Sequence, residues 1–193
     1  MTEKPRQLNP PAFAVPRASK ADLARCLSGA DIMAAVPDAR IRLWRDVHNC
    51  RNIDEFLGQG GKVALLYESQ PNFGHWCTVF RTRRGICFAD PYGELPDEQI
   101  LRVDPHMREV LTETRPLLFR MMENSGYPYV EYDDVPLQVR RDGINTCGRH
   151  AITRLSFSDF PPEEYVDKVF EPVASPADDV VVWATNPVLP RGV

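Results

Sequence analysis

The sequence has no long apolar runs, and this absence argues against a membrane protein. Its longest runs, such as residues 180–184, fall far short of the roughly 18 residues that a membrane span needs. The N-terminus also lacks the apolar core of a signal peptide, so secretion by that route is not expected. We expect no membrane partner.

An excess of positive charge is also missing. The chain has 23 Lys and Arg against 27 Asp and Glu, which gives a formal net charge of -4. A protein without a positive field has no general attraction to phosphate backbones or anionic membranes. Binding to nucleic acid, including a DNA cofactor, is therefore not expected.

Paired cysteines are missing as well. The five cysteines form an odd set without a Cys-x-x-Cys pair, which argues against a disulfide framework and against a standard structural zinc site. His48, Cys50, Cys77 and Cys87 can be combined into a zinc site only on paper, because their spacing is scattered. We expect a reducing compartment, no metal and no cofactor.

Proline is plentiful, but mainly near the two ends of the chain. Of the 18 prolines, 10 lie in residues 1–16 and 161–193. The composition of residues 1–18 predicts an extended arm that either stays mobile or lies along another surface. The length suits one folded domain, which we place at residues 19–173, with a C-terminal extension over 174–193.

Local patterns predict short helices around a small group of strands. Alternating apolar residues and turn signals predict three adjacent strands and two further extended pieces, over residues 62–68, 76–82, 85–89, 129–132 and 137–139. Capping residues and apolar periodicity predict helices over 19–27, 53–57, 148–157 and 163–170, and a helical stretch over 97–123 interrupted by proline.

Reactive polar residues lie at the ends of these apolar elements. A thiol attacks as the thiolate, and the positive end of a helix lowers its pKa. Cys147 comes directly before the predicted helix 148–157 and is the candidate nucleophile. His75 and Asp90 lie at the ends of adjacent predicted strands, where a hairpin brings a base and the group that orients it together.

Two groups are candidate donors to an oxyanion, namely the side-chain amide of Gln138 and the backbone N–H of Cys147. Each residue also has a structural interpretation. His75 can be a strand-end residue, Asp90 can stabilise an Asp-Pro-Tyr-Gly turn, and Cys147 can be an inert buried thiol. Gln138 can be a surface amide.

The order His, acid, Gln, Cys resembles that of the adenovirus-type (adenain-like) maturation cysteine proteases, which are related to the SUMO- and ubiquitin-like-protein proteases. The matching residues are His75-Trp76 after a glycine, the Asp90-Pro-Tyr-Gly turn, Gln138, and Cys147-Gly148 before an apolar helix. Papain-like enzymes have the opposite order, with Cys before His. The resemblance extends from about residue 60 to residue 158.

This resemblance implies an α+β fold with a central mixed β-sheet flanked by helices, and a nucleophile at the N-terminus of a buried helix. It assigns catalysis to His75, Asp90 and Cys147, with Gln138 in the oxyanion hole. It also places Trp76 and Gly148 at the substrate, where Trp76 walls a narrow tunnel that admits Gly-like residues before the scissile bond.

The implied function is that of a virus-encoded cysteine endopeptidase that cleaves structural precursor proteins during particle maturation, in the virion or the infected cell. Its partners would be these protein substrates and a docking partner for the N-terminal arm. The alternatives are an isopeptidase for a ubiquitin-like modifier and an inactive protease-fold protein of a virion.

The sequence departs from the familiar pattern at two positions. Gln138 lies nine residues before Cys147, a longer interval than is usual. The position three residues after the nucleophile, usually aromatic, is His150, which we expect to fill space in the core rather than to act as the base.

Overall fold

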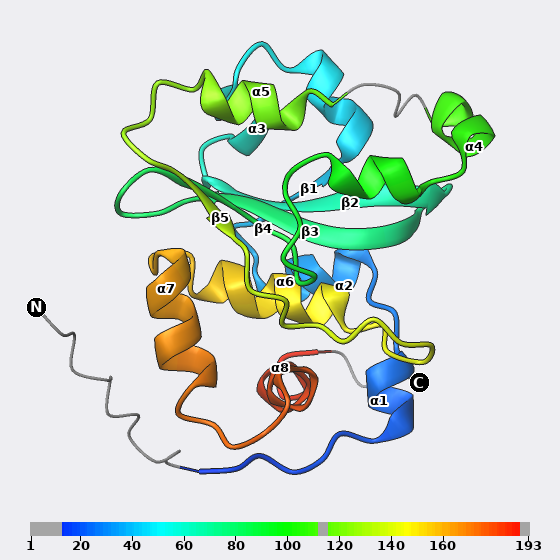
Figure 1. Cartoon of the computed structure of the whole chain (residues 1–193), viewed down its shortest axis with the longest axis vertical. Helices are drawn as coiled ribbons and strands as arrows, with labels where there is room; N and C mark the ends of the chain where they lie inside the picture. Colours follow the sequence, from blue (N-terminus) through cyan, green and yellow to red (C-terminus); the bar gives the residue numbers. More distant parts are fainter. Residues whose placement is uncertain (1–12, 112–115, 190–193) are drawn as a thin grey trace, which may run out of the picture.

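The alternating apolar segments between residues 62 and 89 pair as predicted and form the middle of a sheet. The computed structural model describes residues 13–111 and 116–189, an α+β arrangement in which a five-stranded mixed sheet is flanked by helices (Figure 1). Most of the predicted N-terminal arm, residues 1–12, lies outside the described residues.

The strands follow one another across the sheet in chain order. Their bounds are β1 Arg40–Leu43, β2 Lys62–Gln70, β3 Phe73–Arg81, β4 Ile86–Ala89 and β5 Val130–Asp133. The three central strands are antiparallel, whereas β1 runs parallel to β2 and β5 runs parallel to β4. No strand forms over residues 137–139, and the parallel edge strand β1 was not predicted.

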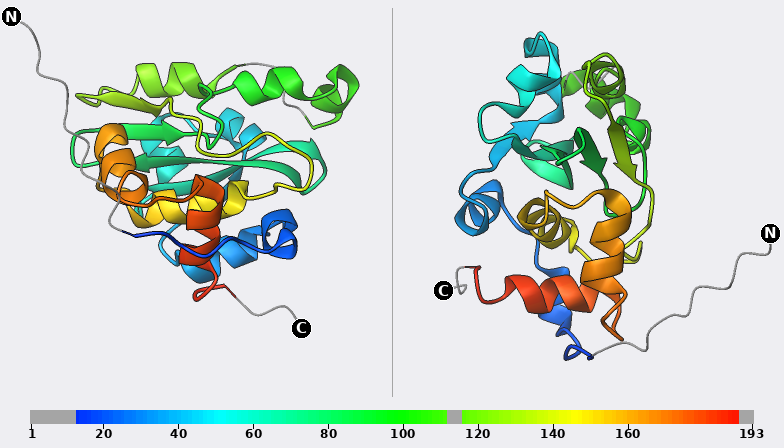
Figure 2. Two further views of the ribbon diagram at one scale, coloured as in Figure 1. Left: turned by 60° about the horizontal axis from the view of Figure 1, so that its bottom comes forward. Right: turned by 90° about the vertical axis from the view of Figure 1, so that its left-hand side faces the viewer.

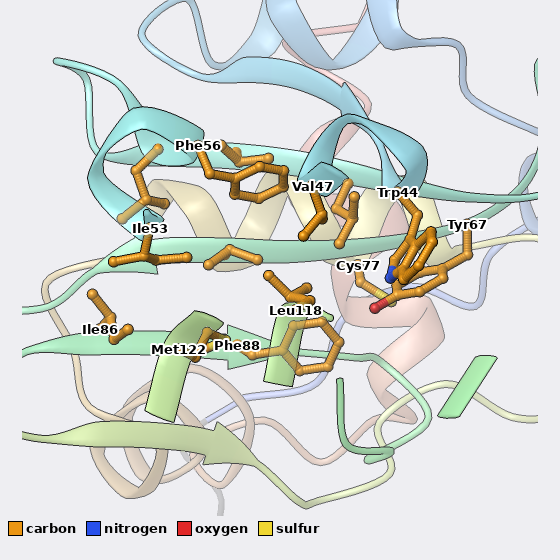
Figure 3. Packing of buried hydrophobic residues seen from close by; sticks show 14 of the residues in the cluster. Trp44, Val47, Ile53, Phe56, Tyr67, Cys77, Ile86, Phe88, Leu118 and Met122 are labelled. Atoms are coloured by element: carbon orange, nitrogen blue, oxygen red, sulfur yellow. The ribbon is translucent and has the colours of Figure 1, made fainter. Parts of the chain in front are cut away.

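Aromatic and aliphatic side chains cover one face of the sheet. This layer contains η1 Trp44–Asn49, α3 Ile53–Leu57 and α5 Leu118–Glu123. Trp44, Phe56 and Leu118 are fully buried there against Val79 and Phe88 of the central strands (Figure 3). Asn52 caps α3 and Gly58 ends it with a positive φ of 66°, so the predicted helix 53–57 is confirmed.

The opposite face of the sheet is covered by the predicted buried helix, α6 Cys147–Ser156, together with α2 Gly29–Ala35 (Figure 1). The helix α8 Ala177–Thr185 packs on the outer side of α6, and α7 Pro162–Tyr165 continues into η3 Val166–Phe170. The predicted C-terminal extension is thus packed on the body that contains α6.

Residues 19–27 form a shorter helix than predicted. Ser19 caps α1 Lys20–Ala24 as expected, but the backbone turns to an extended conformation at Arg25. A capping box between Ser28 and Asp31 then starts α2. Because this second cap lies only nine residues after the first, the chain forms two short helices instead of one.

The remaining helices are η2 Glu98–Arg102 and α4 Pro105–Val110, so the predicted helical stretch is broken at Pro105 as expected. Residues 13–18 run beside α8 (Figure 2), and Ala18 N donates to Asp179 Oδ1 at 2.9 Å. Within residues 13–111 and 116–189, none of the helices has the length and apolar character needed to cross a bilayer.

Candidate active site

Cys147 is the first residue of α6, in the position that the sequence predicted. The next residue has to be small, because a Cβ added to Gly148 would lie 2.8 Å from Leu27 Cβ and 3.4 Å from Trp76 Cδ1. Trp76 is itself fixed, since its Nε1 donates to Leu27 O at 2.9 Å. The nucleophile candidate therefore lies beside a tightly packed tryptophan.

The sheet brings His75 and Asp90 together. The antiparallel pairing of β3 with β4 sets Thr78 opposite Ala89, so Asp90 follows directly at the end of β4. His75 Nε2 donates to Asp90 Oδ1 at 2.8 Å. This bond leaves Nδ1 of the imidazole for the Cys147 thiol, which hydrogen-bonds to His75 as well. The three side chains thus form a hydrogen-bonded series in the order Asp90, His75, Cys147.

The pKa values of His75 and Cys147 shift in opposite directions. Burial works against protonated His75, but the hydrogen bonds to Asp90 and Cys147 prevail and raise the pKa of His75 to about 9. Burial also works against ionised Cys147, yet hydrogen bonds from His75 and from the backbone N–H groups of Trp76 and Gly148 lower the pKa of the thiol. Both shifts favour an imidazolium–thiolate pair.

Asp90 is 1% exposed and is held by three donors. Besides His75, the backbone N–H of Tyr92 donates to Oδ1 at 2.8 Å and Gln99 Nε2 donates to Oδ2 at 2.8 Å. Burial raises the pKa of Asp90, but the bonds from His75 and the other donors outweigh it and the pKa is lowered. The carboxylate is therefore charged and fixed behind the imidazole.

Tyr92 holds the other side of the site. Its ring stacks on that of His75 with centroids 4.5 Å apart and planes 11° apart. The Arg140 guanidinium lies 4.1 Å from the centroid of the same ring. Since two groups so close cannot share one face, the tyrosine ring lies between the imidazole and the guanidinium. This stacking restricts rotation of His75.

Gln138 lies in the same groove as His75 and Cys147 despite the long interval in sequence. Its backbone N–H donates to Pro91 O at 2.8 Å, which anchors it to the turn after Asp90. The side-chain Nε2 has two long hydrogen bonds, each 3.3 Å, to the Tyr92 hydroxyl and Ile144 O. Long bonds hold the amide weakly, so it can turn towards a bound substrate.

Two hollows meet at the thiol. Both include Cys147, Gly74 and Asn145 in their walls; one continues past Trp76, and the other continues past Gln138. Cys147 is thus part of the walls of both hollows.

A comparison with known proteins identifies a viral relative. The chain is 31% identical over 165 residues to the uncharacterized protein V9 of Sputnik virophage, an alignment that covers 82% of this chain and 93% of the virophage protein. The chain belongs to the V9 family. No protein-family model matches it.

Three further residues of this V9 family member, which the sequence analysis considered for other roles, lie in the core. His150 is 3% exposed on α6, and its Nε2 lies 3.2 Å from Asp178 Oδ1 rather than in the groove. Cys77 and Cys87 belong to the cores on opposite faces of the sheet, so the zinc site assembled from the sequence does not form.

One group in the described part of the chain has ligand atoms close enough for a metal ion, namely His75, Cys77 and Asp90, within 4.8 Å of one another. Burial raises the pKa of Cys77 well above its usual value, which disfavours the thiolate that a metal needs. His75 and Asp90 already bind each other. The arrangement therefore suits acid–base chemistry better than metal binding.

Sequence reasoning missed Gln99 and Asp178, which hold the site from outside its motifs. Gln99 comes from η2 and Asp178 from α8. Both are buried, and a polar residue inside a helical pattern gives no sign of a distant partner. Tyr92 belonged to a predicted motif, but its stacking on His75 depends on the tertiary structure.

Proposed function

We propose that this protein is a cysteine endopeptidase of the adenovirus-type maturation class. The observation that supports it is the hydrogen-bonded series Asp90, His75, Cys147, with the sulfur at the start of a buried helix and in the floor of a groove. The sheet with the helix packed on it is compatible with that protease fold. Trp76 lines the hollow beside the sulfur and Gly148 packs closely against it, an arrangement that favours small residues such as Gly before the scissile bond.

The proposed reaction begins with the Cys147 thiolate attacking the scissile carbonyl carbon to form a C–S bond. The carbonyl oxygen becomes an oxyanion, which receives hydrogen bonds from Gln138 Nε2 and the Cys147 N–H. When the C–N bond breaks, the His75 imidazolium gives its proton to the departing amine. A thioester and a neutral imidazole remain.

Deacylation reverses the role of His75. The neutral imidazole takes a proton from a water molecule as its oxygen attacks the thioester carbonyl. The C–S bond then breaks, which releases a carboxylic acid product and restores the thiolate beside the imidazolium. Asp90 stabilises the positive charge on His75 in each cycle and keeps Nδ1 directed at the sulfur.

The relationship to a virophage protein supports a viral setting for this activity. We propose that the substrates are viral structural precursor proteins and that cleavage takes place in the virion or the infected cell. An isopeptidase that acts on a ubiquitin-like modifier would need the same groove and the same thiol. The endopeptidase and the isopeptidase therefore differ in the substrate that they cleave.

A thiol-reactive probe that ends in a Gly-Gly element tests the proposal. The parent protein should be labelled, Cys147→Ala should not, and Cys26→Ser should be labelled like the parent. Cys26 is the matched control because it is exposed and lines the neighbouring hollow. Labelling that depends on Cys26, or none at all, contradicts the proposal. Competition by precursor peptides supports the endopeptidase, whereas competition by a ubiquitin-like protein supports the isopeptidase.

A further inference from the structure

A carboxylate on α8 joins the two ends of the segment 139–146, which connects Gln138 to Cys147. Asp178 is 4% exposed, at the start of a helix more than 30 residues after the nucleophile. Its Oδ2 accepts from the backbone N–H of Val139 at 3.1 Å. Its Oδ1 accepts from the hydroxyl of Thr146 and from His150 Nε2, the latter at 3.2 Å.

Two of these donors are direct neighbours of the candidate oxyanion donors in the chain. Val139 directly follows Gln138, and Thr146 directly precedes Cys147. Thr146 is the N-cap residue of α6, yet its side chain makes no capping bond to that helix; its hydroxyl donates to Asp178 instead. One carboxylate thus holds both ends of the excursion over residues 139–146.

We propose that Asp178 is a positioning residue, which fixes the Gln138 amide relative to the Cys147 N–H so that both donors converge on one oxyanion. This inference rests on the peptidase function proposed above. It accounts for the long interval between Gln138 and Cys147, since the contacts of Asp178 hold the two residues in place without a short connection along the chain. It also accounts for His150, whose ring supplies a third donor to the buried carboxylate.

The chemistry of the contact favours a carboxylate. Asp178 is surrounded by three donors, and an ionised carboxylate has acceptor sites for all of them on its two oxygens. An asparagine has one acceptor oxygen. If that oxygen stays towards the Val139 N–H, the amide N–H groups face Thr146 and His150, so the hydroxyl must rotate and the imidazole must change tautomer to accept them. The contact is then weaker and holds the two ends of the segment less firmly.

The neighbouring residue provides a matched control. Asp179 is also 4% exposed and lies on the same turn of α8, but it accepts from Ala18 N and pairs with Arg17. Asp179→Asn therefore changes an equally buried carboxylate that makes no hydrogen bond to the segment 139–146. Thr146→Ser and Thr146→Val form a second pair, since the first keeps the hydroxyl that Asp178 accepts.

The experiment compares these variants in the full chain by peptide cleavage, by alkylation with iodoacetamide and by thermal unfolding. Asp178→Asn should lower kcat by at least about tenfold. This loss should be smaller than the roughly 10²- to 10³-fold loss expected when an oxyanion donor is deleted. KM and the alkylation rate should stay within twofold of the parent, because neither depends on an oxyanion. Asp179→Asn should keep the parent kcat, and Thr146→Ser should retain more of it than Thr146→Val.

Three results overturn the inference. A kcat of Asp178→Asn within twofold of the parent leaves no positioning role. Parallel losses in kcat, alkylation and unfolding temperature reduce Asp178 to a structural residue. If the parent itself neither cleaves peptides nor reacts with the Gly-Gly probe, the proposed function fails and this inference fails with it, whereas the first two results leave the proposed function standing.

Discussion

Two His–Asp pairs lie near the start of α6, and only one of them includes a histidine that lines the groove. His75 lines it and is bonded to the buried Asp90, whereas neither His150 nor Asp178 is among the residues that line the two hollows at the thiol. The His75 side chain is 14% exposed and that of His150 is 3% exposed. The second nitrogen also differs, since Nδ1 of His75 meets the thiol, while Nδ1 of His150 is buried without a hydrogen-bond partner among the described residues.

The comparison shows that a hydrogen-bonded His–Asp pair does not by itself make a general base. A base needs a free nitrogen that meets a nucleophile and a route for substrate. His75 has both, because the start of β3 lines the groove. His150 lies in the first turn of the buried α6 and meets neither a nucleophile nor the groove, so its pair with Asp178 is suited to positioning rather than to proton transfer.

The largest expected effect comes from removing the thiol. Cys147→Ala should lower peptide cleavage by about 10⁴-fold or more, because the covalent step is lost. The fold should persist, since one small side chain contributes little packing energy. Cleavage assays with circular dichroism check this; a variant that still cleaves would remove Cys147 from the site.

Exchanging the two histidines tests the comparison directly. His75→Ala should be nearly as damaging as losing the thiol, because both the base and the partner of the thiolate disappear. His150→Phe should lower kcat less than tenfold, since Asp178 keeps its other two donors. Cleavage rates of both variants check this, and the reverse ranking would mean that His150 is the base.

The acid behind the base should matter less than the base. Asp90→Asn should reduce kcat by roughly 10³-fold, less than the loss of Cys147, with KM nearly unchanged, because an amide neither stabilises imidazolium nor fixes its orientation in the same way. Steady-state kinetics separate the two parameters. A loss confined to KM would assign Asp90 to the turn or the groove.

The oxyanion amide should have a smaller effect. Gln138→Ala should slow turnover by about 10²- to 10³-fold while iodoacetamide alkylates Cys147 at the parent rate, since alkylation forms no oxyanion. Gln138→Glu should be similarly poor, because it places an acceptor against the developing negative charge. If both variants cleave within a few-fold of the parent, backbone N–H groups near Asn145 supply the donor.

The smallest effect is a displacement of the pH profile. kcat/KM should rise as pH passes the lowered pKa of Cys147 and fall as His75 loses its proton near pH 9. Burial opposes the charge on His75 and the bond to Asp90 supports it, so Asp90→Asn should move the alkaline limb to lower pH. An alkaline limb that does not move would mean that Asp90 does not act on His75.

Local sequence signals predict the part of the fold that supports the base. The hairpin of β3 and β4 alternates strongly and needs only near neighbours, so the sequence alone is enough to bring His75 and Asp90 together. β1 was missed because its alternation, Arg-Ile-Arg-Leu, extends over only four residues and its parallel partner β2 is not joined to it by a hairpin. The supports of the site were missed because Gln99 and Asp178 act on residues far away in sequence.

The contacts of Asn145 affect when the candidate active site becomes aligned during folding. Asn145 donates to Ala24 O across 121 residues of chain, and Asp178 reaches the same loop from the other end. Contacts between distant residues close late in folding, because the entropy of the intervening loop must be lost first. A chain in which α8 has not yet packed therefore lacks the Asp178 contact to the segment before Cys147. The proposed peptidase would have an unaligned thiol until that contact forms.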